Sequence, residues 1–136
     1  MTSKKRFLFV CIENSNRSQM AQAFAKIHGG DAIEAFSAGS RPSGKINPKA
    51  VEAMRLKDYD LTKHDSKSLT EIPQDVPYDY VVTMGCGDEC PFIPAKNRLD
   101  WQIPDPRNME MPEFLKVRDF IEQQVIGILQ KSAVNQ

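Results

Sequence analysis

The feature that most constrains the fold is a strand that runs directly into a helix near the N-terminus. Residues 6–12, RFLFVCI, are a continuous apolar run rich in β-branched and aromatic side chains, which predicts a strand buried on both faces. Residues 18–28 carry apolar side chains at helical spacing, and Gly29 follows as a stop signal. A buried strand followed closely by a helix is the repeating unit of α/β folds with parallel sheets.

The rest of the chain continues this alternation. The further elements expected, in chain order, are a strand at 32–36, a helix at 48–56 that Asn47 caps, a short helix at 66–72, strands at 79–84 and 98–101, and a last helix that begins at Pro112. This pattern predicts an α/β fold with a parallel sheet. The sequence contains no internal repeat, low-complexity tract or linker, so we expect residues 1–136 to form a single domain.

Charge and hydropathy exclude several classes of function. Eighteen basic residues balance eighteen acidic ones, so no overall field favours nucleic acid or an anionic membrane as a partner. The apolar run at residues 7–12 is too short for a signal peptide, and no other segment approaches the roughly 20 apolar residues of a membrane span. We therefore expect a cytoplasmic protein, in which three cysteines are reactive or bind metal rather than forming a disulfide framework.

The turn between the first strand and the first helix has the chemistry of an oxyanion site. Cys11, Ser37 and Cys86 each fall at or just after the end of a predicted strand, the edge where parallel sheets bind ligands. A turn that enters a helix points backbone N–H groups at one place, and the helix dipole adds partial positive charge there. Arg17 adds a planar fork that suits a tetrahedral oxyanion. Such surroundings favour a reactive thiolate at Cys11, and the alternative is an unreactive thiol at a strand end.

Cys86 and Cys90 follow the third predicted strand and allow three interpretations. They are zinc ligands, two unreactive thiols, or a redox pair that removes oxidation from Cys11. A zinc site needs further ligands, and neither His28 nor His64 has a neighbour at metal spacing. We therefore predict no metal site, and we expect both histidines to lie at the surface.

Several separate segments, in the same order, resemble the low-molecular-weight tyrosine phosphatase family and specifically its arsenate reductases. They are VCIENSNRSQMAQAF, FSAGSRPSGKINPKAVEAM, YVVTMGCGDECPFIP and DWQIPDP. In the phosphatase branch, Pro typically follows the Arg-Ser pair, whereas here Gln19 follows Arg17 and Ser18, as in the arsenate reductases. The resemblance implies an α/β three-layer sandwich with a central four-stranded parallel sheet.

The resemblance also implies a reaction. Cys11 would attack arsenate held by Arg17, and Asp105 would donate a proton to the departing oxygen. Cys86 would then release arsenite by forming a disulfide with Cys11, and Cys90 would carry the disulfide outward to thioredoxin. No cofactor is implied. Pro-Asp-Pro is also ordinary turn chemistry, and this is the alternative interpretation of Asp105.

Other residues of the turn have smaller expected roles. The residues expected to bind the oxyanion are Glu13, Asn14, Ser15, Asn16, Arg17 and Ser18. Ser18 is also expected to hydrogen-bond the Cys11 thiolate, and Asn14 and Ser37 to fix the turn. Glu13 stands where the family often has Gly, and its charge should weaken oxyanion binding unless the side chain turns outward. Trp101 is expected to anchor the Asp105 segment in the core.

Some relatives hold a potassium ion near the turn with a carboxylate, and Lys67 falls at that carboxylate's position. A lysine ammonium can replace the ion, so we predict no potassium requirement.

Three alternative functions remain open. A low-molecular-weight phosphatase would use Cys11, Arg17 and Asp105 through a cysteinyl-phosphate, without needing the later cysteines, but Arg107 stands where a phosphotyrosine enzyme has an aromatic side chain. A non-enzymatic arsenite sensor would leave Asp105 without a purpose. A cysteine phosphocarrier would need neither Arg17 nor the later cysteines.

Overall fold

The computed structural model describes residues 4–73, 77–85 and 93–134. The elements are β1 (Lys5–Cys11), α1 (Arg17–Gly29), β2 (Ile33–Gly39), α2 (Pro48–Arg55), β3 (Tyr78–Thr83), β4 (Ala95–Asp100) and α3 (Met111–Val134), with short 3-10 turns at Gly30–Ala32 and Leu61–Lys63. The predicted strands and long helices are therefore present, with ends displaced by a few residues. Among the described helices, none combines the length and the apolar character needed to cross a membrane.

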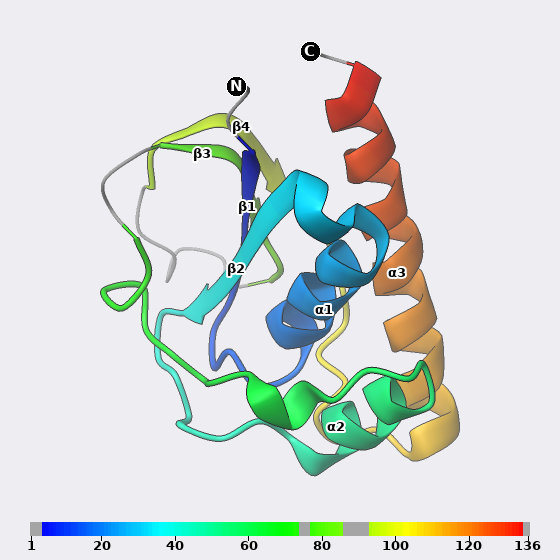
Figure 1. Ribbon diagram of the computed structural model, residues 1–136. Helices are drawn as coiled ribbons and strands as arrows, with labels where there is room; N and C mark the ends of the chain where they lie inside the picture. The colour runs from blue at the N-terminus through cyan, green and yellow to red at the C-terminus, as the bar shows by residue number, and fades with distance from the viewer. Residues whose placement is uncertain (1–3, 74–76, 86–92, 135–136) are drawn as a thin grey trace.

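The four strands form one parallel sheet in the order β2-β1-β3-β4. The predicted α/β fold with a four-stranded parallel sheet is confirmed, and Figure 1 shows α1 and α3 along the same side of that sheet. One face packs against α1, α2 and α3, and the other packs against Leu69 and Ile72. Register places Cys11 beside Gly39 at the end of β1 and β2, and it aligns Val10 with Thr83 of β3. The carboxyl ends of these strands therefore meet at one edge.

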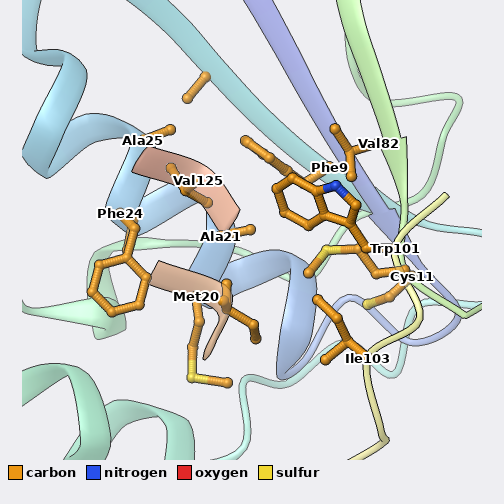
Figure 2. Packing of buried hydrophobic residues seen from close by; sticks show 14 of the residues in the cluster. Phe9, Cys11, Met20, Ala21, Phe24, Ala25, Val82, Trp101, Ile103 and Val125 are labelled. Carbon is orange, nitrogen blue, oxygen red and sulfur yellow. The ribbon is translucent and has the colours of Figure 1, made fainter. Parts of the chain in front are cut away.

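The core follows from the two-sided burial of β1. Phe7 and Phe9 point to the helical face, whereas Leu8 and Val10 point to the other, and all four are fully buried. Each such side chain stabilises the fold by about 1.5–3 kcal/mol. Trp101 packs against Phe9 with ring centroids 6.1 Å apart, which confirms it as a core anchor, and Figure 2 shows Cys11 in the same cluster.

The prediction of a short helix at residues 66–72 is wrong. Ser68 instead forms a parallel bridge with Gly39, and the Gly39 N–H donates to the Lys67 carbonyl at 2.9 Å. The Glu71 carboxylate accepts from the Ser68 N–H at 2.7 Å. Local side-chain hydrogen bonds of this kind compete with a helix, and the N–H at the end of β2 needs a partner that an extended segment supplies.

Candidate active site

A cavity of about 200 Å³ opens at the carboxyl edge of the sheet. It is lined by Cys11, Ile12, Glu13, Ser15, Asn16, Arg17, Arg41, Asp105 and Arg107. We call residues 11–17 the cradle and residues 104–107 the rim segment. The structure thus brings together the predicted thiol, guanidinium and carboxyl group from the two ends of the chain. Ser37 does not line this cavity, because its hydroxyl donates to Gln22 of α1.

The carbonyl groups of the cradle point away from the cavity. Backbone N–H groups of the segment at 40–47 donate to four of them: Ser40 to Cys11 (3.3 Å), Arg41 to Ile12 (2.8 Å), Ser43 to Glu13 (3.1 Å) and Asn47 to Ser15 (3.1 Å). The C=O and N–H of a trans peptide point in opposite directions, so the N–H groups that follow these carbonyls point toward the cavity. The cradle therefore presents positive dipoles to a ligand, and α1 begins directly behind it.

Two positions give the cradle its shape. Asn14 has φ of 51°, a left-handed conformation that Asn tolerates better than most residues. Gly39 packs so closely behind the cradle that a Cβ there would lie 2.5 Å from the Ile12 carbonyl oxygen and 2.9 Å from the Asn14 nitrogen. Gly39 was not predicted as a site residue, although a glycine at the end of a buried strand was a signal for close backbone approach.

Ser18 and Asn14 surround the thiol. Cys11 is a free thiol, 3% exposed, with its Sγ 2.9 Å from the Ser18 Oγ. The Asn14 Nδ2 donates to the same Ser18 oxygen at 2.8 Å. Because that oxygen already accepts a hydrogen bond, the Ser18 hydroxyl proton can be donated to Cys11.

The Arg17 side chain is held in place by the segment that follows β4. Its Nη1 donates to the Ile103 carbonyl at 3.1 Å, and the residue is 7% exposed. Gly85, just beyond β3, has φ of 88°, and a Cβ there would lie 2.5 Å from the Arg17 Nη1. Glycine is therefore required at position 85 both for its conformation and for the guanidinium beside it.

The rim segment carries Asp105 and Arg107 across the mouth of the cavity. The Asp105 Oδ2 lies 3.9 Å from the Arg17 Nη2 and 3.8 Å from the Arg107 Nη2. Arg107 donates its backbone N–H to the Asp105 Oδ1 at 3.0 Å and its Nη1 to the Glu13 Oε2 at 2.7 Å. Arg107 thus pairs the Glu13 charge at the rim, while Glu13 still lines the cavity.

The family model described as low molecular weight phosphotyrosine protein phosphatase matches residues 6–136. The chain belongs to this family. Within it, the curated relatives include arsenate reductase 1 of Staphylococcus haemolyticus, 39% identical over 127 residues, with 90% of this chain and 92% of the relative covered. The arsenate reductase of Brevibacillus brevis is 40% identical over 126 residues and covers 89% and 91%. The family predicted from the quoted motifs is confirmed.

Solved structures agree with these relatives. An arsenate reductase in the phosphate binding state superposes with a TM-score of 0.83 at 32% identity, covering 93% of this chain and 98% of the other. The thioredoxin-dependent arsenate reductase of Corynebacterium glutamicum gives 0.82 at 30% identity and covers 99% of this chain and 65% of its own.

Behind the cradle lies a chain of buried polar side chains that was not predicted from the sequence. The Gln19 Nε2 lies within hydrogen-bond distance of the Asn14 Oδ1 (2.8 Å) and of the Asp65 carbonyl (2.9 Å). The Gln19 Oε1 is 2.9 Å from the His64 Nδ1, and the Tyr59 hydroxyl is 2.6 Å from the His64 Nε2. The sequence signal was a glutamine in the first turn of a helix at an anion site.

The prediction that His64 lies at the surface is wrong, since the residue is 9% exposed. Burial, together with the charges of Lys26 and Lys67, lowers the pKa of His64 from 6.5 to about 4. The imidazole is therefore neutral at pH 7. In the tautomer that satisfies both contacts, Nδ1–H donates to Gln19 and Nε2 accepts from Tyr59.

Lys67 also belongs to this region. Its backbone N–H donates to the Asn14 Oδ1 at 2.9 Å, and its Nζ donates to the Asp65 carbonyl at 3.3 Å. The Lys67 ammonium group is thus placed at the Asp65 carbonyl, and the absence of a potassium requirement stays a prediction. Within the described ranges, no three His, Cys, Asp or Glu side chains gather as metal ligands. Cys86 and Cys90 lie outside the described residues.

Proposed function

We propose that this chain reduces arsenate to arsenite at Cys11, with thioredoxin as the source of electrons. The observation that carries the proposal is the position of the Cys11 thiol at the base of a cradle whose N–H groups and Arg17 suit a tetrahedral oxyanion. The names of the relatives support arsenate as that oxyanion. The thioredoxin-dependent Corynebacterium glutamicum neighbour supports the reductant.

In the first step, the Cys11 thiolate attacks the arsenic of bound arsenate. A sulfur–arsenic bond forms, an arsenic–oxygen bond breaks, and the oxygen leaves as water with a proton from Asp105. The N–H groups of the cradle and the Arg17 guanidinium hold the remaining oxygens and stabilise their charge. The Ser18 hydroxyl lies 2.9 Å from the attacking sulfur and orients it.

In the second step, the Cys86 thiolate attacks the Cys11 sulfur. A disulfide forms, and the electron pair of the sulfur–arsenic bond remains on arsenic, which is reduced from As(V) to As(III) and leaves as arsenite. Cys90 then attacks Cys86, which returns Cys11 to its thiolate form and leaves a Cys86–Cys90 disulfide. The dithiol of thioredoxin reduces that disulfide, and the two electrons balance.

The experiment follows NADPH oxidation and arsenite production with thioredoxin and thioredoxin reductase. Cys86→Ser is expected to produce no arsenite beyond background. Cys90→Ser is expected to produce about one arsenite per chain and then stop, because the Cys11–Cys86 disulfide is not passed outward. Full multiple turnover by Cys90→Ser with thioredoxin would show that the relay through Cys90 is wrong, because thioredoxin would then reduce the enzyme without that residue.

A second candidate function is hydrolysis of phosphate monoesters through a cysteinyl-phosphate. The family membership favours it, since hydrolysis uses the same thiol, guanidinium and carboxyl group. Arg107, 53% exposed at the mouth, leaves no aromatic wall at that position for a tyrosyl group. We therefore expect turnover of an aryl phosphate to be slow beside arsenate reduction. A kcat/KM for aryl phosphate that exceeds the value for arsenate would reverse this assignment.

A further inference from the structure

Four alternating charges cross the mouth of the cavity. They run from Glu13 to Arg107 (2.7 Å), from Arg107 to Asp105 (3.8 Å) and from Asp105 to Arg17 (3.9 Å). Glu13 belongs to the cradle, which follows β1, whereas Asp105 and Arg107 belong to the rim segment, which follows β4. Arg107 is therefore the residue through which a cradle carboxylate reaches the rim.

Strand pairing does not set the distance between these two segments. β1 and β4 are separated by β3 in the sheet, so side chains must hold the rim segment at the cradle. The Asp105 side chain is 43% exposed, and the Arg107 backbone N–H holds one of its oxygens at 3.0 Å. When the Arg107 side chain is anchored, the turn that presents Asp105 is therefore anchored with it.

The Glu13 carboxylate also determines where the Arg107 charge lies. Arg107 has two carboxylates within reach and makes its short contact, 2.7 Å, with Glu13 rather than with Asp105 at 3.8 Å. Without Glu13, the guanidinium would be free to form the closer pair with Asp105 or to enter the cavity. Either movement would draw Asp105 away from the oxygen that it must protonate.

We propose that Glu13 is a positioning residue, which acts through Arg107 to hold Asp105 over the Cys11 cradle. The proposal relies on the proposed function in one respect, namely that Asp105 is the proton donor. It accounts for a carboxylate beside an anion site. Because Arg107 already pairs the Glu13 charge, Glu13 repels the oxyanion only weakly. Its benefit to the placement of Asp105 therefore exceeds its cost to oxyanion binding.

The competing explanation is an exposed ion pair without a role in turnover. Such pairs contribute little, and the Glu52–Arg55 pair on α2 is a matched example, with both side chains well exposed. If Glu13 and Arg107 were a pair of this kind, Glu13→Gln would leave kcat unchanged. It would also lower KM, since one negative charge would be removed beside the oxyanion.

The kinetic test compares Glu13→Gln, Arg107→Gln and the double variant, with Glu52→Gln as the control. We expect Glu13→Gln to lower kcat for arsenate about fivefold with a smaller change in KM, and the double variant to be no slower than Arg107→Gln alone. Arg107→Lys should retain part of the rate because the charge remains. Glu52→Gln should match the wild type. Equal kcat for Glu13→Gln and the wild type would overturn the proposal.

The pathway through Asp105 is tested by epistasis. In an Asp105→Asn background, adding Glu13→Gln should cost nothing further in the single-turnover rate, because the group that Glu13 positions is already lost. A further fivefold loss in that background would show that Glu13 acts in some other way.

A measurement without substrate separates this proposal from the proposed function. The Arg107 backbone amide resonance should shift in Glu13→Gln and not in Glu52→Gln, because its hydrogen bond to Asp105 changes. An unchanged Arg107 amide resonance in Glu13→Gln would overturn the positioning role of Glu13, whichever substrate the enzyme reduces. If the wild-type protein fails to reduce arsenate but Glu13→Gln still shifts the Arg107 amide resonance, the proposed function is overturned. The link from Glu13 through Arg107 to Asp105 then still holds.

Discussion

The cradle and the rim segment face each other across one cavity, but different interactions hold them. Backbone hydrogen bonds from residues 40–47 and a buried side-chain network fix the cradle. The rim segment carries a half-exposed carboxyl group, and ion pairs at 3.8–3.9 Å surround it. Buried hydrogen bonds leave costly unpaired groups when broken, whereas exposed ion pairs contribute little. We therefore expect the cradle to be rigid before a ligand arrives, and the Asp105 carboxyl group opposite it to be adjustable.

Substitution of the two arginines tests this difference most strongly. Arg17→Lys should lower kcat/KM for arsenate by about 10²–10³-fold, because the planar fork that holds the oxyanion is lost from a buried site. Arg107→Lys, on the exposed rim, should lower it about fivefold or less. The steady-state thioredoxin-coupled assay measures both. Losses of similar size in the two variants would contradict the difference between the cradle and the rim segment.

Close backbone packing behind the cradle gives the next largest effect. Gly39→Ala places a Cβ 2.5 Å from the Ile12 carbonyl oxygen, so the cradle must move, and a displacement of about 1 Å costs roughly 10²-fold in rate. Gly127→Ala, on α3, meets no atom within 4 Å and should leave the rate unchanged while stabilising the helix by up to about 1 kcal/mol. Thermal unfolding of both variants shows whether a loss of rate comes from an unfolded protein or from a displaced cradle. Wild-type kcat/KM in Gly39→Ala would contradict a rigid cradle.

The network behind the cradle predicts a dependence of stability on pH. His64 has a pKa of about 4 in the folded protein and 6.5 when unfolded, so only the unfolded state binds its proton between these values. This histidine therefore contributes stability above pH 6.5, and the contribution falls by up to about 1.4 kcal/mol per pH unit as the pH drops toward 4. Urea unfolding at several pH values should show a shallower loss for His64→Gln than for the wild type. Parallel curves would contradict a neutral, buried His64.

The smallest expected effect concerns potassium. Lys67 already places an ammonium group at the Asp65 carbonyl, so replacing sodium by potassium at constant ionic strength should leave kcat/KM unchanged. Lys67→Asp provides the opposite case, since it restores a carboxylate for a cation and should introduce a dependence on potassium. Severalfold activation of the wild-type chain by potassium would show that Lys67 does not replace the ion.

Features that depend on neighbouring residues in the sequence were predicted, whereas features that depend on residues far apart in the chain were not. The turn from Cys11 to Arg17 and the cap at Asn47 are local, so strand and helix signals located them correctly. The role of Asp105 rests on a resemblance to a motif and stays a prediction, while the structure places its carboxyl group at the cavity. The pairing of Glu13 with Arg107 joins residues 94 positions apart and depends on side-chain conformations that no local pattern encodes.

Burial of polar residues was the other source of error. His64 was expected at the surface because a lone histidine among polar neighbours carries no sign of burial, yet Gln19 and Tyr59 satisfy both of its ring nitrogens. The segment at 66–72 was expected to be helical, but the N–H at the end of β2 pairs with it instead. Both features depend on tertiary partners.

The most direct test of the central claim is a single turnover by Cys90→Ser without an external reductant. Arsenate is added, arsenite per chain is measured, and mass spectrometry of peptides locates any disulfide. We predict about one arsenite per chain and a Cys11–Cys86 disulfide, with neither product in the Cys11→Ser/Cys90→Ser double variant. Absence of arsenite from Cys90→Ser, or equal arsenite from the double variant, would contradict reduction of arsenate at the Cys11 cradle.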